Sequence, residues 1–267
     1  MITYGALIKI RFINGLQYRA AALAGIVTQY CFGFMFISQY LAFYRTNPSA
    51  FPMEVSHLVS YIWVQQAFMA LYFSWFYEND IFAAIRNGHI AYDLARPVDL
   101  YGKWFCQSIG NRLSKAVLRC FPILIVAVFL PHPYRLIFPP DIMQLVYFIL
   151  STALTLGVVT AFSMFVYIST FYTMSPMGVR IIAGIMGDFL AGSIVPIPFF
   201  PDRFRQIAQL LPFAAMQNVP LRIYSGNIFG REALAALLFQ LFWLAVLSVT
   251  GIFWMNKTIK RTIVQGG

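Results

Sequence analysis

Residues 78–103 read ENDIFAAIRNGHIAYDLARPVDLYGK and form a polar interruption in an otherwise apolar chain. The stretch contains four of the nine acidic residues of a protein in which only 10% of residues are charged. Charges are expensive in hydrocarbon, so a group this dense must lie in water. Apolar spans of a membrane protein are therefore expected on either side of it.

The first part of this stretch predicts a short helix over residues 81–86. Asn79 or Asp80 can cap its N-terminal N–H groups. Gly88 can adopt the left-handed conformation that ends a helix. The result is a helix of about two turns.

A second short segment is expected over residues 89–95. It must stop at Arg96, because Pro97 disfavours helical angles in the residue before it. Asp99 then offers an N-cap for the helix that enters the membrane.

The two predicted segments share an apolar face, formed by Ile81, Phe82, Ile85, Ile90, Tyr92 and Leu94. Most loops are solvated connectors, and an ordinary connector is the simplest interpretation. An apolar face on a water-exposed connector, however, usually docks against something. We therefore predict a docking surface on this loop.

The overall composition is typical of a multi-spanning membrane protein. The chain has 267 residues, is 60% hydrophobic and has a mean hydropathy of +0.71. A helical span needs about 20 residues, so this length holds roughly six spans and no soluble domain. The three cysteines have no metal or disulfide spacing.

The sequence predicts an all-α integral membrane protein with a single transmembrane domain over residues 1–267. An amphipathic interfacial helix over residues 1–19 precedes the first span. Six transmembrane helices are expected at about residues 20–44, 57–77, 104–130, 141–172, 179–195 and 228–255. Residues 196–227 are too rich in proline to span and predict an outer hairpin with a short re-entrant or interfacial helix.

Three predicted spans carry polar side chains. Arg112, Lys115 and Arg119 share one face of the third, which must therefore lie at the interface or line a wet cavity. In the fourth, Thr155 and Thr160 favour close helix packing over a transport path. Asp188 in the fifth is either a functional carboxylate or one that is hydrogen-bonded to a neighbouring helix.

The distribution of basic residues predicts the orientation. With the N-terminus inside, 13 of the 19 basic residues lie on the cytoplasmic side or at the start of the third span. The other six lie outside: Arg45, Arg135, Arg203, Arg205, Arg222 and Arg231. The positive-inside rule therefore places both termini and the 78–103 loop in the cytoplasm. Anionic lipid headgroups, and not nucleic acid, are the expected counter-charge for the net charge of +10.

Several chemistries have no support in the sequence. It contains no GxxxxGK[ST], GxSxG or HExxH pattern and no cluster of metal ligands, so neither ATP binding of the Walker type nor an integral membrane enzyme is expected. Inverted repeats with paired broken helices, which mark many secondary transporters, are not visible.

The loop contains two short motifs, Ile85-Arg86-Asn87-Gly88 and Leu94-Ala95-Arg96-Pro97. A similar pair, roughly Ile-Arg-x-Gly and Leu-x-Arg-Pro, follows the second span in one branch of the ABC-2 type exporters. In layout, too, the chain resembles the permease subunit of these exporters, in the branch with paired permease genes beside one ATPase gene.

The resemblance implies an ATP-driven exporter of the bacterial cytoplasmic membrane. Separate ABC ATPase subunits would bind ATP and Mg, this chain would hold no cofactor, and a second permease, related or identical, would complete the path. The ATPase-coupling residues would be Asp80, Ile81, Phe82, Ile85, Arg86, Asn87, Gly88, Asp93, Leu94, Arg96 and Pro97. Ile81, Phe82 and Ile85 would anchor the loop in the ATPase. Arg86, Asp93 and Arg96 would orient it through paired charges.

Two alternatives remain open from the sequence. A membrane scaffold could recruit a cytosolic partner through the same loop without transport. An ion-coupled carrier could use Asp188, with Thr155 and Thr160 along its path. The aromatic content of 18% suits an apolar or amphipathic cargo but equally suits lipid contact.

Overall fold

The computed structural model describes residues 2–173 and 175–261, and this part of the chain is helical without strands. The elements in order are α1 (Ile2–Gly15), α2 (Arg19–Thr46), η1 (Pro48–Ala50), α3 (Val55–Ala67), α4 (Met69–Tyr72), α5 (Asn79–Arg86), α6 (Ile90–Leu94), α7 (Leu100–Phe129), α8 (Ile142–Thr173), α9 (Pro176–Ala191), η2 (Ile197–Phe199), α10 (Asp202–Leu210), α11 (Pro212–Met216), α12 (Asn218–Tyr224) and α13 (Gly230–Ile259).

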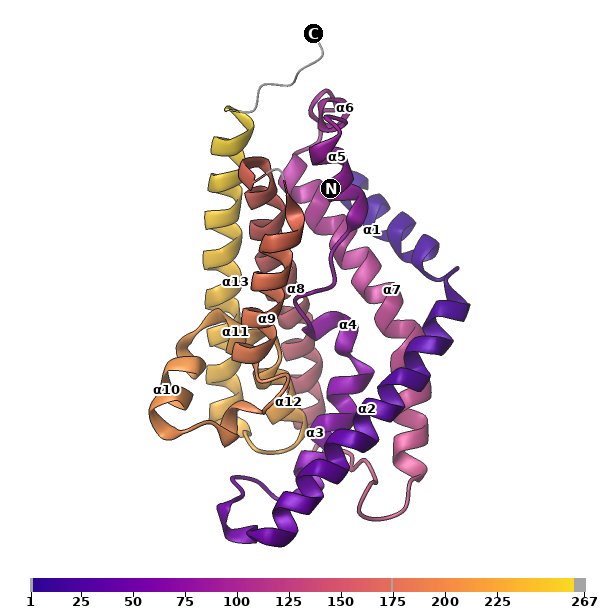
Figure 1. The fold of residues 1–267 in the computed structure, drawn as a ribbon, viewed down its shortest axis with the longest axis vertical. Helices are drawn as coiled ribbons and strands as arrows, with labels where there is room; N and C mark the ends of the chain where they lie inside the picture. The colour runs from indigo at the N-terminus through magenta and orange to yellow at the C-terminus, as the bar shows by residue number, and fades with distance from the viewer. Residues whose placement is uncertain (1, 174, 262–267) are drawn as a thin grey trace.

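The long helices run along the length of the molecule (Figure 1). Helices α5 and α6 lie at one end, together with the C-terminal end of α13, and α1 lies obliquely beside them. The short helices α10 to α12 and the turn η1 lie toward the opposite end. The loop before α7 and the hairpin before α13 are therefore far apart.

Three helices in the described residues are long and apolar enough to cross a membrane: α2, α8 and α13, with 28, 32 and 30 residues. Helix α7 is as long, with 30 residues, but it carries Lys103, Arg112, Lys115 and Arg119. Helix α9 has 16 residues, and α3 has 13. The fold is that of an integral membrane protein, and three of the six predicted spans meet the length and composition of a crossing helix.

The predicted second span, residues 57–77, is not one helix. Helix α3 ends at Ala67, α4 adds a single turn to Tyr72, and residues 73–78 are not helical. We call residues 73–78 the break. The stretch contains neither glycine nor proline, so the prediction of a continuous helix was wrong for a reason that lies elsewhere in the chain.

The predicted fifth span also ends early. Helix α9 stops at Ala191, and Gly192 follows with φ of +84°, a left-handed conformation that glycine adopts without strain. A Cβ at Gly192 would lie 2.9 Å from the backbone nitrogen of Ile197. The helix therefore ends four residues before the predicted end of the span at Val195, and the chain turns into the hairpin over residues 196–227.

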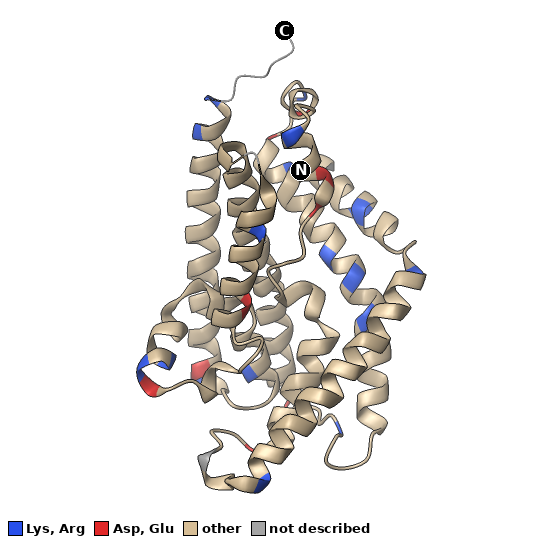
Figure 2. Cartoon of the chain, viewed as in Figure 1, with Lys and Arg blue, Asp and Glu red and all other residues tan. Residues whose placement is uncertain are grey.

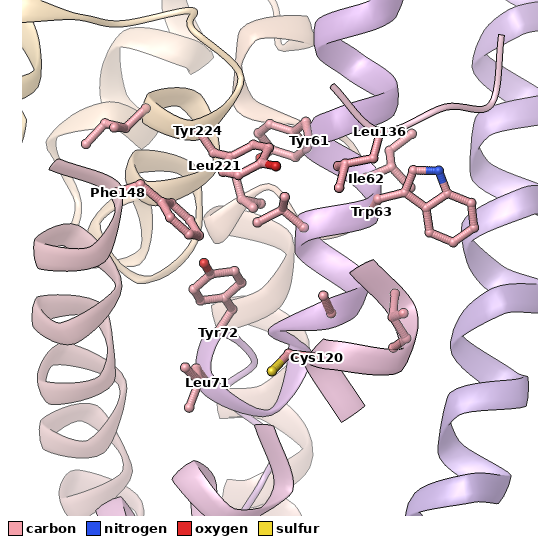
Figure 3. Close-up of a cluster of buried hydrophobic side chains, with 14 of the residues drawn as sticks. Tyr61, Ile62, Trp63, Leu71, Tyr72, Cys120, Leu136, Phe148, Leu221 and Tyr224 are labelled. Carbon is pink, nitrogen blue, oxygen red and sulfur yellow. The ribbon is translucent and has the colours of Figure 1, made fainter. Parts of the chain in front are cut away.

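The main apolar core joins α3, α4, α7, α8 and α12 in the half of the molecule away from α5. Figure 3 shows Tyr72, Phe148 and Tyr224 close together, with Trp63 and Leu136 beside them. The Phe148 and Tyr224 ring centroids are 5.0 Å apart in an edge-to-face arrangement. The Trp63 indole N–H donates to the Tyr134 carbonyl at 2.8 Å.

Helix α1 packs closely along the first half of α7. A Cβ at Gly110 would lie 2.6 Å from the backbone carbonyl oxygen of Ile8. On the other helix, a Cβ at Gly15 would overlap the Ser114 side chain. Within the stretch predicted as a helix over residues 1–19, the structure has α1 at Ile2–Gly15, and glycine on both α1 and α7 allows their backbones to approach.

The hairpin over residues 196–227 has more structure than the one short helix predicted. It contains η2, α10, α11 and α12, of which α10 is the predicted helix after Pro201. Gln217 and Asn218 in this hairpin are fully buried, and Ser193 donates its hydroxyl to Gln217 Oε1 at 2.9 Å. The hairpin is thus part of the packed structure and does not stand apart from it.

Candidate functional site

The predicted docking loop folds into two short helices at one end of the molecule. Helix α5 spans residues 79–86 and α6 residues 90–94, and Gly88 between them has φ of +72°. The Asp99 carboxylate accepts the backbone N–H of Gly102 at 2.6 Å, so the predicted cap of α7 is present. The start of α5 differs, because its N-cap residue is Glu78 and no side chain caps it.

The apolar face of α5 is turned inward. Ile81 and Phe82 are each 3% exposed and Ile85 is 7% exposed. They belong to a core cluster with α7 and α8, in which the Phe82 and Tyr167 ring centroids are 5.0 Å apart. This chain buries the three side chains against its own α7 and α8, so they are not exposed to a partner in this structure, and their role as anchors in an ATPase stays a prediction.

The exposed part of the loop is its tip. Arg86, Asn87, Gly88 and His89 are exposed in the turn between the two helices, as are Arg96 and Pro97 after α6. The Tyr92 side chain is 73% exposed. Leu94 is half-buried and packs on the same cluster as Ile90. We call the exposed residues 86–89, Tyr92, Arg96 and Pro97 the tip.

Ion pairs and hydrogen bonds fix the loop to its neighbours. Asp80 pairs with Arg11 of α1, and Asp93 pairs with Lys103 of α7. Asp93 was predicted to orient a partner, but its carboxylate is engaged within the chain. Arg180 of α9 donates to Asn79 Oδ1 at 3.1 Å and lies over the Phe82 ring, 4.9 Å from its centroid. We call the remaining residues of α5 and α6 the base. The base contacts α1, α7, α8 and α9, and the tip projects from it.

Directly before the loop, the break in the second span is held by a buried arginine. Arg112 of α7 is 1% exposed. Its guanidinium donates to the carbonyls of Ala70 at 3.1 Å, Phe73 at 2.9 Å and Phe76 at 2.7 Å, and to Ser163 Oγ at 3.1 Å. Backbone carbonyls that leave a helix inside a membrane protein need such donors. Arg112 thus replaces the helical hydrogen bonds that the break removes.

The same break is held from its other side by a carboxylate. Ser74 donates its backbone N–H and its hydroxyl to Asp188 Oδ1 of α9, both at 3.0 Å. A Cβ at Gly187 would lie 2.7 Å from Ser74 Oγ, so glycine there lets α9 approach the break. Asp188 is therefore hydrogen-bonded to a neighbouring segment, which is one of the two alternatives that the sequence left open.

At the junction with α5, the break ends in a third set of bonds. The Glu78 backbone N–H donates to the Tyr167 hydroxyl of α8 at 2.7 Å. The Glu78 carboxylate accepts from the Asn111 side-chain amide of α7. Three helices, α7, α8 and α9, therefore hold residues 73–78.

A groove opens beside the break between α2 and α9, and its size is within the range of small-molecule sites. Its volume is about 740 Å³. Phe32, Phe36, Phe73, Trp75 and Ile181 supply apolar wall, and Gln66, Arg180 and Asp188 supply polar groups. The groove therefore combines a mostly apolar surface with a few polar groups at its inner side.

A family model described as ABC-2 family transporter protein matches residues 53–262. The match begins just before α3 and covers the break, the loop and the hairpin. The chain belongs to this family. Members of this family are membrane permease components of ABC transporters, and the family implies association with ABC ATPases. Searches of curated proteins and of solved structures give no match.

In this permease, Thr155 and Thr160 do not lie with Asp188. Both side chains are fully buried in α8. The Thr155 hydroxyl donates to the Ala215 carbonyl at 3.2 Å and accepts from Gln240 Nε2 of α13 at 2.9 Å. Neither threonine lines the groove beside the break. Their assignment to a transport path stays a prediction, and in this structure Thr155 joins α8 to α11 and α13.

Sequence reasoning missed the part that Arg112, Ser74 and Tyr167 play in the permease. Arg112 was expected at the interface or in a wet cavity, and the structure buries it on backbone carbonyls instead. One signal was present in the sequence: a basic residue one turn before Lys115 and two turns before Arg119 in an apolar helix needs acceptors. Nothing in the sequence showed that the acceptors belong to residues 70–76.

Proposed function

We propose that the chain is the permease subunit of an ATP-driven exporter in a bacterial cytoplasmic membrane, with both termini and the α5–α6 loop in the cytoplasm. Six segments cross the membrane in this proposal: α2, the α3–α4 pair with its break, α7, α8, α9 and α13. A second permease, identical or related, completes the path, and separate ATPase subunits bind ATP and Mg.

The observation that carries this proposal is the combination of an exposed tip with a base that contacts four other helices. The tip exposes Arg86, His89, Tyr92 and Arg96, while Ile81, Phe82 and Ile85 are packed inside. Exposed aromatic and arginine side chains are the residue types that dominate protein interfaces. A tip of this kind fits a groove on an ATPase. Because the base is bonded to its neighbours, a displacement of the tip would move the base and the break that precedes it.

Transmission follows from the chain order. Helix α5 begins at Asn79, immediately after the break at residues 73–78. A rigid-body movement of the tip therefore pulls on a segment that is not helical and is held by side chains of other helices, among them Arg112, Asp188 and Tyr167. Closure of ATPase subunits around ATP supplies such movements in ABC transporters, and a non-helical segment absorbs them as a hinge.

The groove between α2 and α9 would be this chain's wall of the export path. Phe73, Trp75 and Asp188 of the groove belong to the break or bind to it, so a shift of the break reshapes the groove. Its apolar walls suit an apolar or amphipathic cargo. Coupling in this proposal needs no distant residues, because the break directly precedes the helix that leads to the tip and also contributes residues to the groove.

Co-purification tests this proposal. Tagged protein, solubilised in mild detergent from its native membrane, should retain an ATPase with a Walker motif and should stimulate its ATP hydrolysis. Arg86→Glu reverses a charge at the tip and should lower the retained ATPase at least about tenfold, as for loss of an interface arginine. Arg203→Glu is the matched control, because Arg203 is also exposed but lies on α10 toward the opposite end.

The result for Arg86→Glu should come with an unchanged melting temperature, since its side chain contacts no acceptor in the described residues. Equal retention of the ATPase by both variants and by the wild type would exclude the tip as the coupling element. Retention of a partner without any ATP hydrolysis would favour the scaffold alternative.

A further inference from the structure

A second cavity lies apart from the groove beside the break. Its volume is about 550 Å³, and it is formed where α1, the start of α2, the start of α5 and the middle of α7 meet. Figure 2 shows basic residues spaced along this part of α7. Among the residues that line it are three cations, Arg11, Lys115 and Arg119, and two acids, Glu78 and Asp80.

The two acids in this cavity already have partners. Asp80 forms an ion pair with Arg11. The Glu78 carboxylate accepts from the Asn111 amide, and Glu78 makes no ion pair within 4 Å in the described residues. The lining therefore carries three cations against two acids, and Lys115 and Arg119 form no ion pair within 4 Å in the described residues.

Neither cation has an oxygen acceptor within the described part of the chain. The Lys115 ammonium lies over the Phe76 ring, 5.5 Å from its centroid, and makes no hydrogen bond. The Arg119 guanidinium also makes none, and its Nε is buried without a partner. Buried donors are almost always satisfied in native proteins, so an unpaired guanidinium at a cavity points to an absent acceptor.

The spacing of the two residues adds to this argument. Lys115 and Arg119 are four residues apart on α7, so their charges lie one above the other and repel. On the same face of α7, the terminal nitrogens of Arg112 donate to backbone carbonyls of residues 70–76, whereas its Nε, like that of Arg119, is buried without a partner. Lys115 meets that segment through the Phe76 ring and not through a carbonyl, so an anion from outside the chain would give Lys115 and Arg119 the oxygen acceptors that they lack in the described residues.

The position of the cavity identifies the kind of anion. Its mouth includes Tyr18, an aromatic side chain that is 71% exposed at the bend between α1 and α2. Tyrosines of this kind are common at the headgroup level of a bilayer. On the inner side, Arg119 packs against Gly25, where a Cβ would lie 2.6 Å from the guanidinium carbon. Gly25 is six residues into α2, about 9 Å from its start, within reach of a headgroup.

We propose that this cavity binds the phosphate diester of an anionic phospholipid, with Lys115 and Arg119 as the phosphate ligands. The lipid tails would pass along the exposed apolar surface of α2, where Leu23 and Val27 are 64% and 63% exposed. Bound there, the lipid joins α1, α2 and α7 and places one negative charge between the two cations. The site rests on the membrane location of the chain and not on the identity of an ATPase.

Lipid titration in detergent tests the site. The purified full chain in dodecyl maltoside would be titrated with short-chain phosphatidylglycerol, with the phosphatidylcholine of equal chain length, and with inorganic phosphate. Native mass spectrometry would count bound lipid, and a melting curve would report stabilisation. We expect phosphatidylglycerol to bind and stabilise, phosphatidylcholine to bind at least about tenfold more weakly, and inorganic phosphate to have little effect.

Variants locate the binding to the cavity. Lys115→Gln and Arg119→Gln should each lower the affinity for phosphatidylglycerol about tenfold, the effect of losing one charge-assisted hydrogen bond. Arg203→Gln and Arg231→Gln remove exposed cations elsewhere and should leave it unchanged. Gly25→Ala keeps both charges but displaces the Arg119 guanidinium, so it should also weaken binding if Arg119→Gln fails to fold.

Three outcomes would overturn the proposal. Equal affinity of Lys115→Gln, Gly25→Ala and wild type would remove the cavity as the site. Equal binding of phosphatidylcholine and phosphatidylglycerol would show that lipid charge is not recognised. Inorganic phosphate binding as tightly as phosphatidylglycerol, with loss in the same variants, would assign the cavity to a free phosphate and exclude the lipid.

Discussion

At the scale of single residues, Arg112 explains how a membrane span can be interrupted without glycine or proline. Its guanidinium reaches three carbonyls of residues 70–76 from a different helix. The planar fork of arginine offers five donors, whereas lysine offers three on one point. The identity of this residue, and not only its charge, therefore stabilises the break.

Arg112→Lys should destabilise the protein although it conserves the charge. Lysine cannot reach all three carbonyls, and each buried carbonyl left unpaired costs about 1–3 kcal/mol. We expect a clear fall in the melting temperature in detergent, measured by size-exclusion after heating. Arg231→Lys, at an exposed position on α13, should not change it. An unchanged melting temperature for Arg112→Lys would mean that the break is stable without the hydrogen bonds of the guanidinium.

Asp188 gives a second prediction at this scale. One oxygen, Oδ1, accepts both bonds from Ser74, and asparagine retains a carbonyl oxygen that can take its place. Asp188→Asn should therefore keep the melting temperature and the association with an ATPase. Asp188→Ala should lose both bonds and cost about 1–3 kcal/mol, because the Ser74 N–H is left buried and unpaired.

The ion-coupled carrier makes the opposite prediction for this residue. If Asp188 carried a proton or cation, Asp188→Asn would abolish activity while the protein stayed folded. Comparison of the melting temperature and of ion-driven transport in the absence of an ATPase, in the same two variants, separates these alternatives.

At the scale of elements, the glycines between α1 and α7 set the position of the lead-in helix. A Cβ at Gly110 would press on the carbonyl oxygen of Ile8, which belongs to backbone and cannot move aside. Gly110→Ala should push α1 away from α7 and weaken the Arg11–Asp80 pair. A fall of about 1–3 kcal/mol in stability is expected, as for overpacking in a core.

Gly5→Ala in α1 is the control for this prediction. Nothing lies within 4 Å of a Cβ at Gly5, and alanine is the better helix former by about 1 kcal/mol. This variant should be neutral or slightly stabilising in the same melting experiment. Equal effects of Gly5→Ala and Gly110→Ala would contradict the close packing of α1 on α7.

The elements also show what the sequence could and could not predict. The helix at residues 79–86 was predictable, because its apolar residues recur at helical spacing and Gly88 ends it. The same spacing says that one face of the helix is covered but not what covers it. Here the cover is Tyr167 of α8, whose position relative to Phe82 depends on the tertiary fold.

The break illustrates the same limit in a membrane span. Residues 57–77 form an apolar run of the right length, and local rules predict one helix there. The interruption depends on Arg112 and Asp188, which lie 39 and 114 residues from the atoms they hold. Local sequence carries no record of such partners, so this part of the site became visible only in the structure.

At the scale of the whole molecule, the tip, the break and the groove of this permease are neighbours. The tip is exposed at one end, the break lies beneath it, and the groove opens beside the break. The hairpin over residues 196–227, with buried Gln217 and Asn218, packs into the other part of the bundle. In the proposed mechanism, a push on the tip reaches the groove through the break.

Photo-crosslinking from the tip tests the central claim most directly. A photoreactive amino acid would replace Tyr92, which is 73% exposed at the tip, and in a control chain it would replace Ile207, which is 58% exposed on α10. Both chains would be irradiated in their native membrane. We predict an adduct between position 92 and an ATPase that carries a Walker motif, and no such adduct from position 207. Absence of an ATPase adduct from position 92, or an equal yield from both positions, would contradict the account.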